Sequence, residues 1–216
     1  MNYTHILFDL DGTLVDSLPG IAYSVDYAFN ATGYARAALD LKALLGPPIR
    51  SILKQLAVGA GESDLDALVR AFRASYDSEG WQRTAHFEGA LEALEAFRGA
   101  GKQMFIVTNK PLDATTRILR RLGTHAFFRE VATPDSRSPA YVSKSAILGD
   151  LVERYLIHAS NSLLVGDTLE DVRAAAEVGM RAAIMTHGYG GPEASGWKRF
   201  DSFRDLVAVC LSEVQA

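Results

Sequence analysis

Two aspartates, two residues apart, follow the first apolar run of the chain. Asp9 and Asp11 come directly after Ile6–Phe8, whose unbroken apolar character is typical of a strand buried on both faces of a parallel sheet. Side chains two apart on an extended backbone point the same way, so these carboxylates repel each other unless a cation lies between them. Carboxylate oxygens are ligands that Mg²⁺ prefers. The spacing therefore predicts a magnesium-dependent active site at the end of this strand.

The same stretch has an alternative interpretation as a β-hairpin. Asp11-Gly12 between apolar residues is a strong signal for a tight turn, and Asp9 would then be an ordinary surface residue. The following segment argues against this, because Asp16–Pro19 has the capping residue and early proline typical of a helix start. We therefore favour the active-site interpretation.

Polar residues also follow two later apolar runs. Thr108 and Asn109 end the run QMFIVT, and they offer the hydroxyl, amide and N–H groups that bind phosphate, although they could simply form a turn. Asp167 follows the run SLLV, with Asp171 four residues later, so a helix there would stack both carboxylates on one face. Capping that helix is the alternative role for Asp167. Because strand ends of a doubly wound sheet meet at one edge, we expect these side chains to converge.

The remaining pattern predicts an α/β fold with an inserted helical domain. Residues 16–83 carry helical spacing only, which is too much helix for an ordinary crossover between parallel strands. From residue 89 onward, helices alternate with apolar runs, as in a parallel sheet with helices on both faces. We expect a doubly wound parallel sheet, a Rossmann-like core, over residues 1–15 and 84–216, with an all-helical cap at 16–83. The apolar runs expected to form its strands are 6–8, 103–108, 127–132, 162–165 and 181–185.

Composition and charge argue against several classes of function. The chain of 216 residues is 48% hydrophobic and has a net charge of −4, without the basic cluster that nucleic acid attracts. No apolar run approaches the roughly 18 residues of a membrane span, and the first residues lack the pattern of a signal peptide. The single cysteine, Cys210, allows no intrachain disulfide and fits a reducing compartment. We expect a cytoplasmic globular protein without nucleic-acid or membrane partners.

Three segments in combination resemble the signature motifs of the haloacid dehalogenase superfamily. They are residues 9–16 (DLDGTLVD), 107–109 (VTN) and 166–171 (GDTLED). Within that superfamily the chain is most similar to phosphoglycolate phosphatase-type hydrolases, which carry a helical cap inserted after the first motif, and the segments DSLPGI and GPPIR resemble that group too. The resemblance spans nearly the whole chain. It implies a Mg²⁺-dependent phosphomonoester hydrolase acting on a small phosphorylated metabolite such as phosphoglycolate, and we expect a monomer or homodimer.

The resemblance also implies roles for individual residues. Asp9 would be the nucleophile that forms an aspartyl-phosphate. Asp11 would be the general acid for the leaving alcohol and then the base that activates water. The metal would be held by Asp9, by the backbone carbonyl of Asp11 and by Asp167, with Asp171 in support. Thr108 would act with these catalytic groups at the phosphate.

Members of this family have a lysine between the second and last motifs, which neutralises the nucleophile and the phosphate. Lys144 is the candidate, because it is the only lysine between Lys110 and Lys198. The Lys-Pro pair usual in the family is absent here, so a solvated lysine at a helix start is the alternative. Arg137 could then supply the charge through its planar fork.

Substrate contacts are expected from Thr108, Asn109 and Lys144, and from Arg50 if the cap closes over the site. A phosphomutase of the same family would use the same two aspartates but return the phosphoryl group to a sugar. A haloacid dehalogenase attacks carbon without Mg²⁺ and lacks the second aspartate, so Asp11 argues against it. A phospho-accepting signalling domain shares the acidic residues but has no inserted cap.

Overall fold

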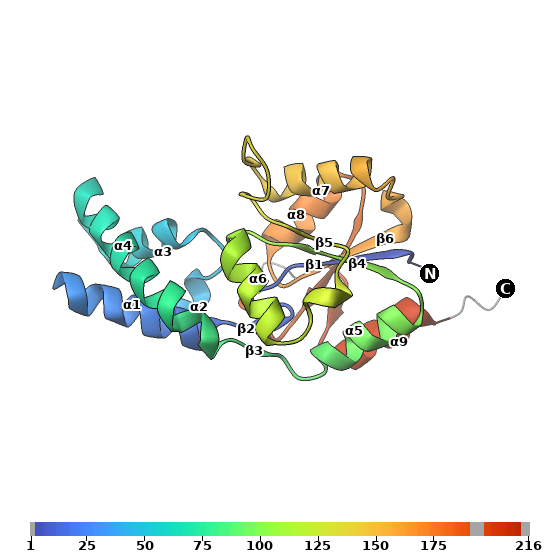
Figure 1. Cartoon of the computed structure of the whole chain (residues 1–216), viewed down its shortest axis with the longest axis horizontal. Helices are drawn as coiled ribbons and strands as arrows, with labels where there is room; N and C mark the ends of the chain where they lie inside the picture. The colour runs from blue at the N-terminus through green and yellow to red at the C-terminus, as the bar shows by residue number, and fades with distance from the viewer. Residues whose placement is uncertain (1–2, 191–196, 213–216) are drawn as a thin grey trace. The chain divides into compact units, whose positions relative to one another are not determined.

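The chain forms two compact units in the computed structural model, which describes residues 3–190 and 197–212 (Figure 1). The first unit contains the described residues of Met1–Asp16 and His86–Ala216, and the second contains Ser17–Ala85. Among the described residues, no helix combines the length and the apolar character that crossing a bilayer requires.

A parallel β-sheet forms the centre of the first unit. Its six described strands lie in the order β5-β4-β1-β6-β7-β8, and all neighbours pair in parallel. The chain winds outward from β1 to β5 and then outward again from β6 to β8, so its direction changes between β1 and β6. This confirms the predicted doubly wound α/β core. The strands are β1 (His5–Phe8), β4 (Gln103–Val107), β5 (Glu130–Ala132), β6 (Ser162–Gly166), β7 (Arg181–Met185) and β8 (Arg199–Phe200).

Helices cover both faces of this sheet, which is why β1 has an unbroken apolar sequence. They are α5 (Ala90–Gly99), α6 (Leu112–Arg121), α7 (Lys144–Arg154), α8 (Leu169–Glu177) and α9 (Phe203–Leu211), with short 3-10 helices η2 (His125–Phe127) and η3 (Ala159–Asn161). Ile6 and Phe8 pack in one cluster with residues of α5 and α9, among them the buried Cys210. Leu7 packs in a second cluster with residues of α7 and α8. Figure 1 shows these two helix pairs on opposite faces of the sheet.

Two strands at the sheet edges differ from the prediction. β5 begins only at Glu130, because the preceding residues form η2 and Phe128 turns into the core. β8 was not predicted, since two residues leave no periodic pattern. It joins the sheet beside β7, where the N–H of Ile184 donates to the carbonyl of Lys198 at 2.9 Å.

The second unit is all helical apart from its junction with the first. Its elements are α1 (Leu18–Thr32), α2 (Leu41–Leu44), α3 (Ile49–Leu56), α4 (Glu62–Ser78) and the 3-10 helix η1 (Gly80–Arg83). The hydroxyls of Ser24 on α1 and Ser75 on α4 form a buried hydrogen bond of 3.2 Å. Gly20 allows α1 to pass close to η1, because a Cβ there would lie 2.1 Å from the carbonyl oxygen of Gly80. Short strands β2 (Val15–Asp16) and β3 (Ala85–His86) pair at the junction.

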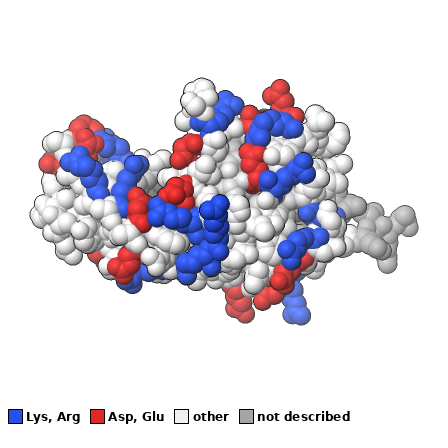
Figure 2. All heavy atoms as spheres, in the orientation of Figure 1, with Lys and Arg blue, Asp and Glu red and all other residues white. Residues whose placement is uncertain are grey.

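Some exposed charges on or beside the helices form local pairs of opposite sign. On α6 the guanidinium of Arg117 binds the carboxylate of Asp113 one turn earlier, and next to α4 that of Arg83 binds Glu79 at 2.6 Å. Figure 2 shows acidic and basic side chains interspersed on the visible face. Exposed pairs of this kind contribute only about 0.3–0.5 kcal/mol each to stability, so the buried apolar clusters dominate the energetics of the fold.

The close approach at Gly20 predicts opposite effects for two glycine substitutions. Gly20→Ala should lower the free energy of unfolding by about 1–3 kcal/mol, because the new methyl group meets backbone that has no room to move. Gly149→Ala, inside α7 where the structure leaves open space, should instead raise it by about 0.5–1 kcal/mol. Chemical unfolding followed by circular dichroism measures both, and equal effects of the two substitutions would contradict the packing described for α1.

Candidate active site

The backbone turns sharply after β1 and does not return as a strand. The N–H groups of residues 13–15 approach the carbonyl oxygen of Leu10 at 3.0–3.3 Å, and Gly12 has the left-handed φ of +82° that favours glycine. Both edges of β1 are already paired, with β4 and with β6. The hairpin alternative is therefore wrong, and the turn continues through β2 into α1.

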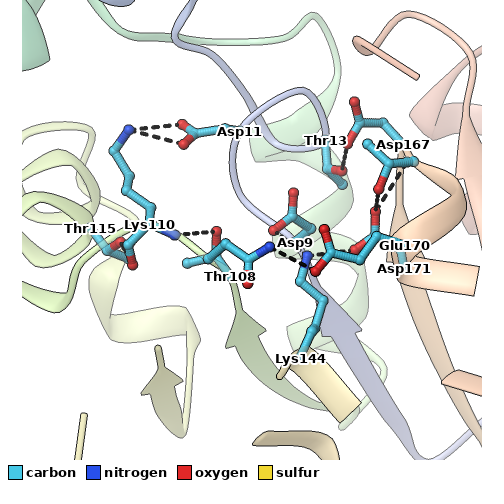
Figure 3. A network of polar contacts seen from close by, with 12 residues as sticks. Asp9, Asp11, Thr13, Thr108, Lys110, Thr115, Lys144, Asp167, Glu170 and Asp171 are labelled. Atoms are coloured by element: carbon cyan, nitrogen blue, oxygen red, sulfur yellow. Dashed lines mark hydrogen bonds and ion pairs between the residues drawn. The ribbon is translucent and has the colours of Figure 1, made fainter. Parts of the chain in front are cut away.

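Three buried carboxylates meet beyond the ends of β1 and β6, as Figure 3 shows. One oxygen each of Asp9, Asp167 and Asp171 lies within 4.8 Å of the other two. The reason is the register of the sheet: Phe8 lies opposite Val165, so residues that follow the two strands leave the sheet at the same edge. Three hard oxygen donors at this spacing fit a divalent cation such as Mg²⁺.

Lys144 is the cation that the structure places among these carboxylates. Its Nζ donates to Asp171 Oδ1 at 2.6 Å and to Asp9 Oδ1 at 3.1 Å. Burial alone would lower the pKa of Lys144, but the charges of the two aspartates outweigh burial and raise that pKa above its ordinary value. The lysine is the first residue of α7, where the hydroxyl of Ser143 accepts from the N–H of Ala146 at 3.1 Å. Arg137 is instead paired with Asp150 at 3.0 Å on the surface.

Asp171 lies in the first turn of α8, but Asp167 does not share that helix with it. Thr168 is the N-cap, and both its N–H and its hydroxyl donate to Asp171 Oδ2, at 3.0 and 2.7 Å. The expected stacking of the two carboxylates on one helix face is therefore wrong, as is a capping role for Asp167. The physical reason is that Thr168 and Asp171 form a capping box at the N-terminus of α8, so Asp167 precedes the helix.

The backbone around Asp167 encloses its carboxylate closely. Oδ2 accepts the N–H of Tyr189 at 2.6 Å, and Oδ1 accepts the hydroxyl of Thr13 at 3.4 Å. The phenol of Tyr189 is held in turn by Asp16 at 2.9 Å. Three glycines pack against the same aspartate. A Cβ added at any of them would lie 1.9–2.3 Å from an atom of Asp167: Gly12, Gly188 and Gly190. A carboxylate held this closely is a preorganised ligand.

The three carboxylates of the cluster differ in pKa, because burial, mutual repulsion and Lys144 affect them unequally. Burial, with the charges of neighbouring aspartates, raises the pKa of Asp167 to about 8. The pKa of Asp9 rises to about 6, where burial again outweighs the attraction of Lys144. Asp171 is the exception, because the charge of Lys144 and the hydrogen bonds from Lys144 and Thr168 hold its pKa below its ordinary value despite burial. Lys144 thus favours the ionised form of Asp171, whereas Asp9 and Asp167 ionise less readily than usual, and a bound cation would favour their ionisation.

Asp11 points away from that cluster, toward Lys110 (Figure 3). The ammonium of Lys110 donates to both carboxylate oxygens, at 2.9 and 3.2 Å. Sequence reasoning did not assign a role to Lys110. A signal was nevertheless present, because it is the third polar residue in succession after β4, in the segment Thr108-Asn109-Lys110.

The two residues before Lys110 lie at the same sheet edge. The N–H of Thr108 donates to the carbonyl of Ala132 at 3.2 Å, and its buried hydroxyl accepts the N–H of Lys110 at 3.4 Å. The side-chain amide of Asn109 donates to Glu170 Oε1 at 2.9 Å. β4 is paired in register with β1, which explains why both residues emerge beside Asp9.

Arg50 lies in the helical unit, where it is paired with acidic residues of α4. Its guanidinium contacts Asp66 at 2.5 Å and Glu62 at 2.6 Å, and the three side chains are exposed. The structure therefore gives Arg50 two carboxylate partners within its own unit, and a phosphate would have to compete with them.

The pKa values predict how stability depends on pH in the absence of metal. Asp9 and Asp167 bind protons more tightly in the folded than in the unfolded chain, so the free energy of unfolding should fall as pH rises from about 5 to about 8. Asp171, with its lowered pKa, acts oppositely and only below its ordinary value of 3.8. Urea unfolding in the presence of a chelator measures this dependence.

Asp167→Asn tests the source of this pH dependence, because it removes the carboxyl group with the highest pKa of the cluster. It should flatten the dependence between about pH 6 and 8, while Asp113→Asn on the exposed face of α6 should leave it unchanged. Stability that is constant or rises over this range in the metal-free protein would show that the cluster is not strained by its charge.

Comparison with known proteins agrees with this geometry. Residues 6–185 match the family model for haloacid dehalogenase-like hydrolases. The chain is 35% identical over 186 residues to the tyrosine-protein kinase PtkA of Mycobacterium tuberculosis (strain ATCC 25618 / H37Rv), a match that covers 86% of this chain and 62% of that relative. It is 32% identical over 223 residues to the phosphoglycolate phosphatase of Vibrio parahaemolyticus, which covers 97% of this chain and 93% of that protein.

A solved structure gives the same result. A protein described as a predicted phosphoglycolate phosphatase from Haemophilus somnus superposes with a TM-score of 0.84 at 25% identity, and the match covers 97% of this chain and 98% of that one. These similarities confirm the resemblance inferred from the three motifs. The chain belongs to the haloacid dehalogenase-like hydrolase family, and within it to the hydrolases that are similar to phosphoglycolate phosphatase.

Proposed function

We propose that this protein is a Mg²⁺-dependent phosphomonoester hydrolase that acts on a small organic phosphate of the phosphoglycolate type through an aspartyl-phosphate. The observation that carries the proposal is the position of Asp9. It is buried at the end of the central strand, beside Asp167 and Asp171, with Lys144 on one of its oxygens. Attack of a carboxylate on a negatively charged phosphate requires cations beside the nucleophile, which Lys144 and a Mg²⁺ held by the neighbouring carboxylates would supply.

The metal would be held by the carboxylates of Asp9 and Asp167 and by the backbone carbonyl of Asp11. Asp171 would support the site through Lys144, because its Oδ1 forms an ion pair with that ammonium at 2.6 Å while Thr168 binds its Oδ2. Mg²⁺ supplies charge neutralisation and orientation of the phosphate when it is bound. Thr108, Asn109 and Lys144 would contact the remaining phosphate oxygens, and Arg50 would contribute only after leaving Glu62 and Asp66.

The proposed reaction has two steps, formation and hydrolysis of the aspartyl-phosphate. A carboxylate oxygen of Asp9 attacks phosphorus, the P–O bond to the alcohol breaks, and Asp11 gives its proton to the leaving oxygen. In the second step Asp11 takes a proton from water, the water oxygen attacks the aspartyl-phosphate, and inorganic phosphate leaves. The different surroundings of Asp9 and Asp11 support this division, since Asp9 is buried beside two further carboxylates whereas Asp11 is more exposed and lies outside that cluster.

One observation favours a second acceptor for the phosphoryl group. The relative that is 35% identical is named as a tyrosine-protein kinase. Transfer of the phosphoryl group from the same aspartyl-phosphate to a tyrosine hydroxyl would again use Asp9, with the hydroxyl in place of water. A phosphomutase differs in the same way, with a sugar hydroxyl as acceptor. Measuring inorganic phosphate beside phosphorylated protein and phosphorylated sugar distinguishes the three, and hydrolysis predicts phosphate as the main product.

Replacement of the nucleophile tests the proposal directly. Asp9→Asn should lower phosphate release from a panel of phosphate esters by about 10⁴-fold or more, because the neutral amide cannot attack phosphorus. Asp113→Asn, an exposed substitution on α6, should leave it unchanged. Near-normal turnover by the Asp9→Asn protein, with its circular dichroism spectrum intact, would rule out this nucleophile.

Removal of divalent cations should also stop turnover. Treatment with a chelator leaves the buried carboxylates without their neutralising ion, so phosphate release should fall to background and return when Mg²⁺ is added in excess. The assay compares the treated and restored protein on the same ester. Full activity in the metal-free protein would contradict the proposal and favour chemistry of the dehalogenase type.

A further inference from the structure

The ion pair between Lys110 and Asp11 lies outside the three-carboxylate cluster. Both oxygens of Asp11 contact the one ammonium, at 2.9 and 3.2 Å. The exposed fractions of the two side chains are 7% for Lys110 and 23% for Asp11. Contact through both oxygens defines the orientation of the carboxylate, and low exposure reduces the competition from water. This pair is therefore a defined structural feature of the site.

The backbone of Lys110 is held on both sides, and its side chain is buried, so the range of positions open to its ammonium is limited. Its N–H donates to the hydroxyl of Thr108 at 3.4 Å, and its carbonyl accepts the hydroxyl of Thr115 at 3.4 Å. Pro111 follows as the N-cap of α6, with φ of −56°. A buried lysine on a restrained backbone has fewer positions open to it than a flexible surface lysine, so less freedom is lost when it forms an ion pair.

The pair separates two carboxylates that would otherwise be drawn to the same cations. Asp9 and Asp11 are two residues apart, yet Asp9 contacts Lys144 and Asp11 contacts Lys110 (Figure 3). Without Lys110, the Asp11 carboxylate would lose the contact that directs it away from Asp9 and Lys144. The segment that carries Lys110 also carries Thr108, so one stretch of backbone positions both the acid–base group and a phosphate contact.

We propose that Lys110 is a positioning residue for Asp11, an inference that rests on the hydrolysis proposed above. Its ammonium holds the Asp11 carboxylate beside the leaving oxygen and the attacking water, and apart from Asp9. Lys110 gives up no proton in either step. The proton that reaches the leaving oxygen comes from Asp11, and the proton of the attacking water returns to Asp11.

A double-mutant cycle between Lys110 and Asp11 tests the inference in the Mg²⁺-loaded protein. Lys110→Met should lower kcat for an alkyl phosphate by about 10²-fold, the cost of a misplaced catalytic group, and change KM by less than about threefold. Lys110→Arg keeps the charge and should recover most of the activity. In the Asp11→Asn protein, Lys110→Met should add no further loss, since the group that it positions is already absent.

Two features of the kinetics separate positioning from a general structural effect. The loss in Lys110→Met should be smaller for p-nitrophenyl phosphate, whose leaving group needs no proton, than for the alkyl ester. Lys198→Met, an exposed lysine before β8, is the matched control and should match the unchanged protein. Losses of Lys110→Met and Asp11→Asn that multiply in the double variant, or a Lys110→Met protein with normal kcat, would overturn the inference.

Crystal structures of the Lys110 variants without substrate give an answer that does not depend on turnover. The Asp11 carboxylate should leave its position in Lys110→Met and keep it in Lys110→Arg. An Asp11 carboxylate that stays in place in the methionine variant would overturn the positioning role. Failure of the unchanged protein to release phosphate from any ester would overturn the proposed hydrolysis instead, so the two failures are distinguishable.

Discussion

Repulsion between carboxylates that the fold forces together is the constraint on which the rest of the site depends. β1 and β6 are neighbours in register, so Asp9 and Asp167 leave the sheet at one edge, and the helix start after β6 adds Asp171. Burial makes this arrangement costly, as the raised pKa values of Asp9 and Asp167 show. Lys144 offsets part of the charge, and the donor set fits a divalent cation for the remainder.

The surrounding structure keeps these groups in place through a helix cap, an ion pair and close backbone contacts. Asp171 is fixed by Thr168 and Lys144 together, which combines a helix cap with an ion pair. Asp167 is held by a backbone N–H and by glycines that leave room for nothing larger. Such contacts limit the motion of each carboxylate, which is the preorganisation that phosphoryl transfer demands. Asp11 has a separate lysine, and this separation makes two roles for two nearby carboxylates physically reasonable.

The sequence predicted the sheet and the convergence of distant acidic residues because both follow from simple rules. Unbroken apolar runs marked the buried strands, and parallel strands bring their ends to one edge. Local hydrogen bonding was harder to predict. Thr168 is the N-cap of α8, so the helix begins after Asp167 and not at it. The polar segment 108–110 indicates that Lys110 lies at the sheet edge, but the partner of its ammonium could not be predicted, because Asp11 is far away in the sequence. The support of Asp167 by Tyr189 was not predicted either, because it comes from the backbone N–H of that residue and not from its side chain.

Titration calorimetry of Mg²⁺ binding near neutral pH tests the central claim most directly, because it measures the cation that the cluster requires. With Asp167 at a pKa of about 8 in the metal-free fold, binding should release protons to the buffer, and the heat should change with the ionisation enthalpy of that buffer. The account predicts one Mg²⁺ per chain with proton release in the unchanged protein, and binding lost in Asp167→Asn. Absence of binding in the unchanged protein, or equal binding by the variant, would contradict it.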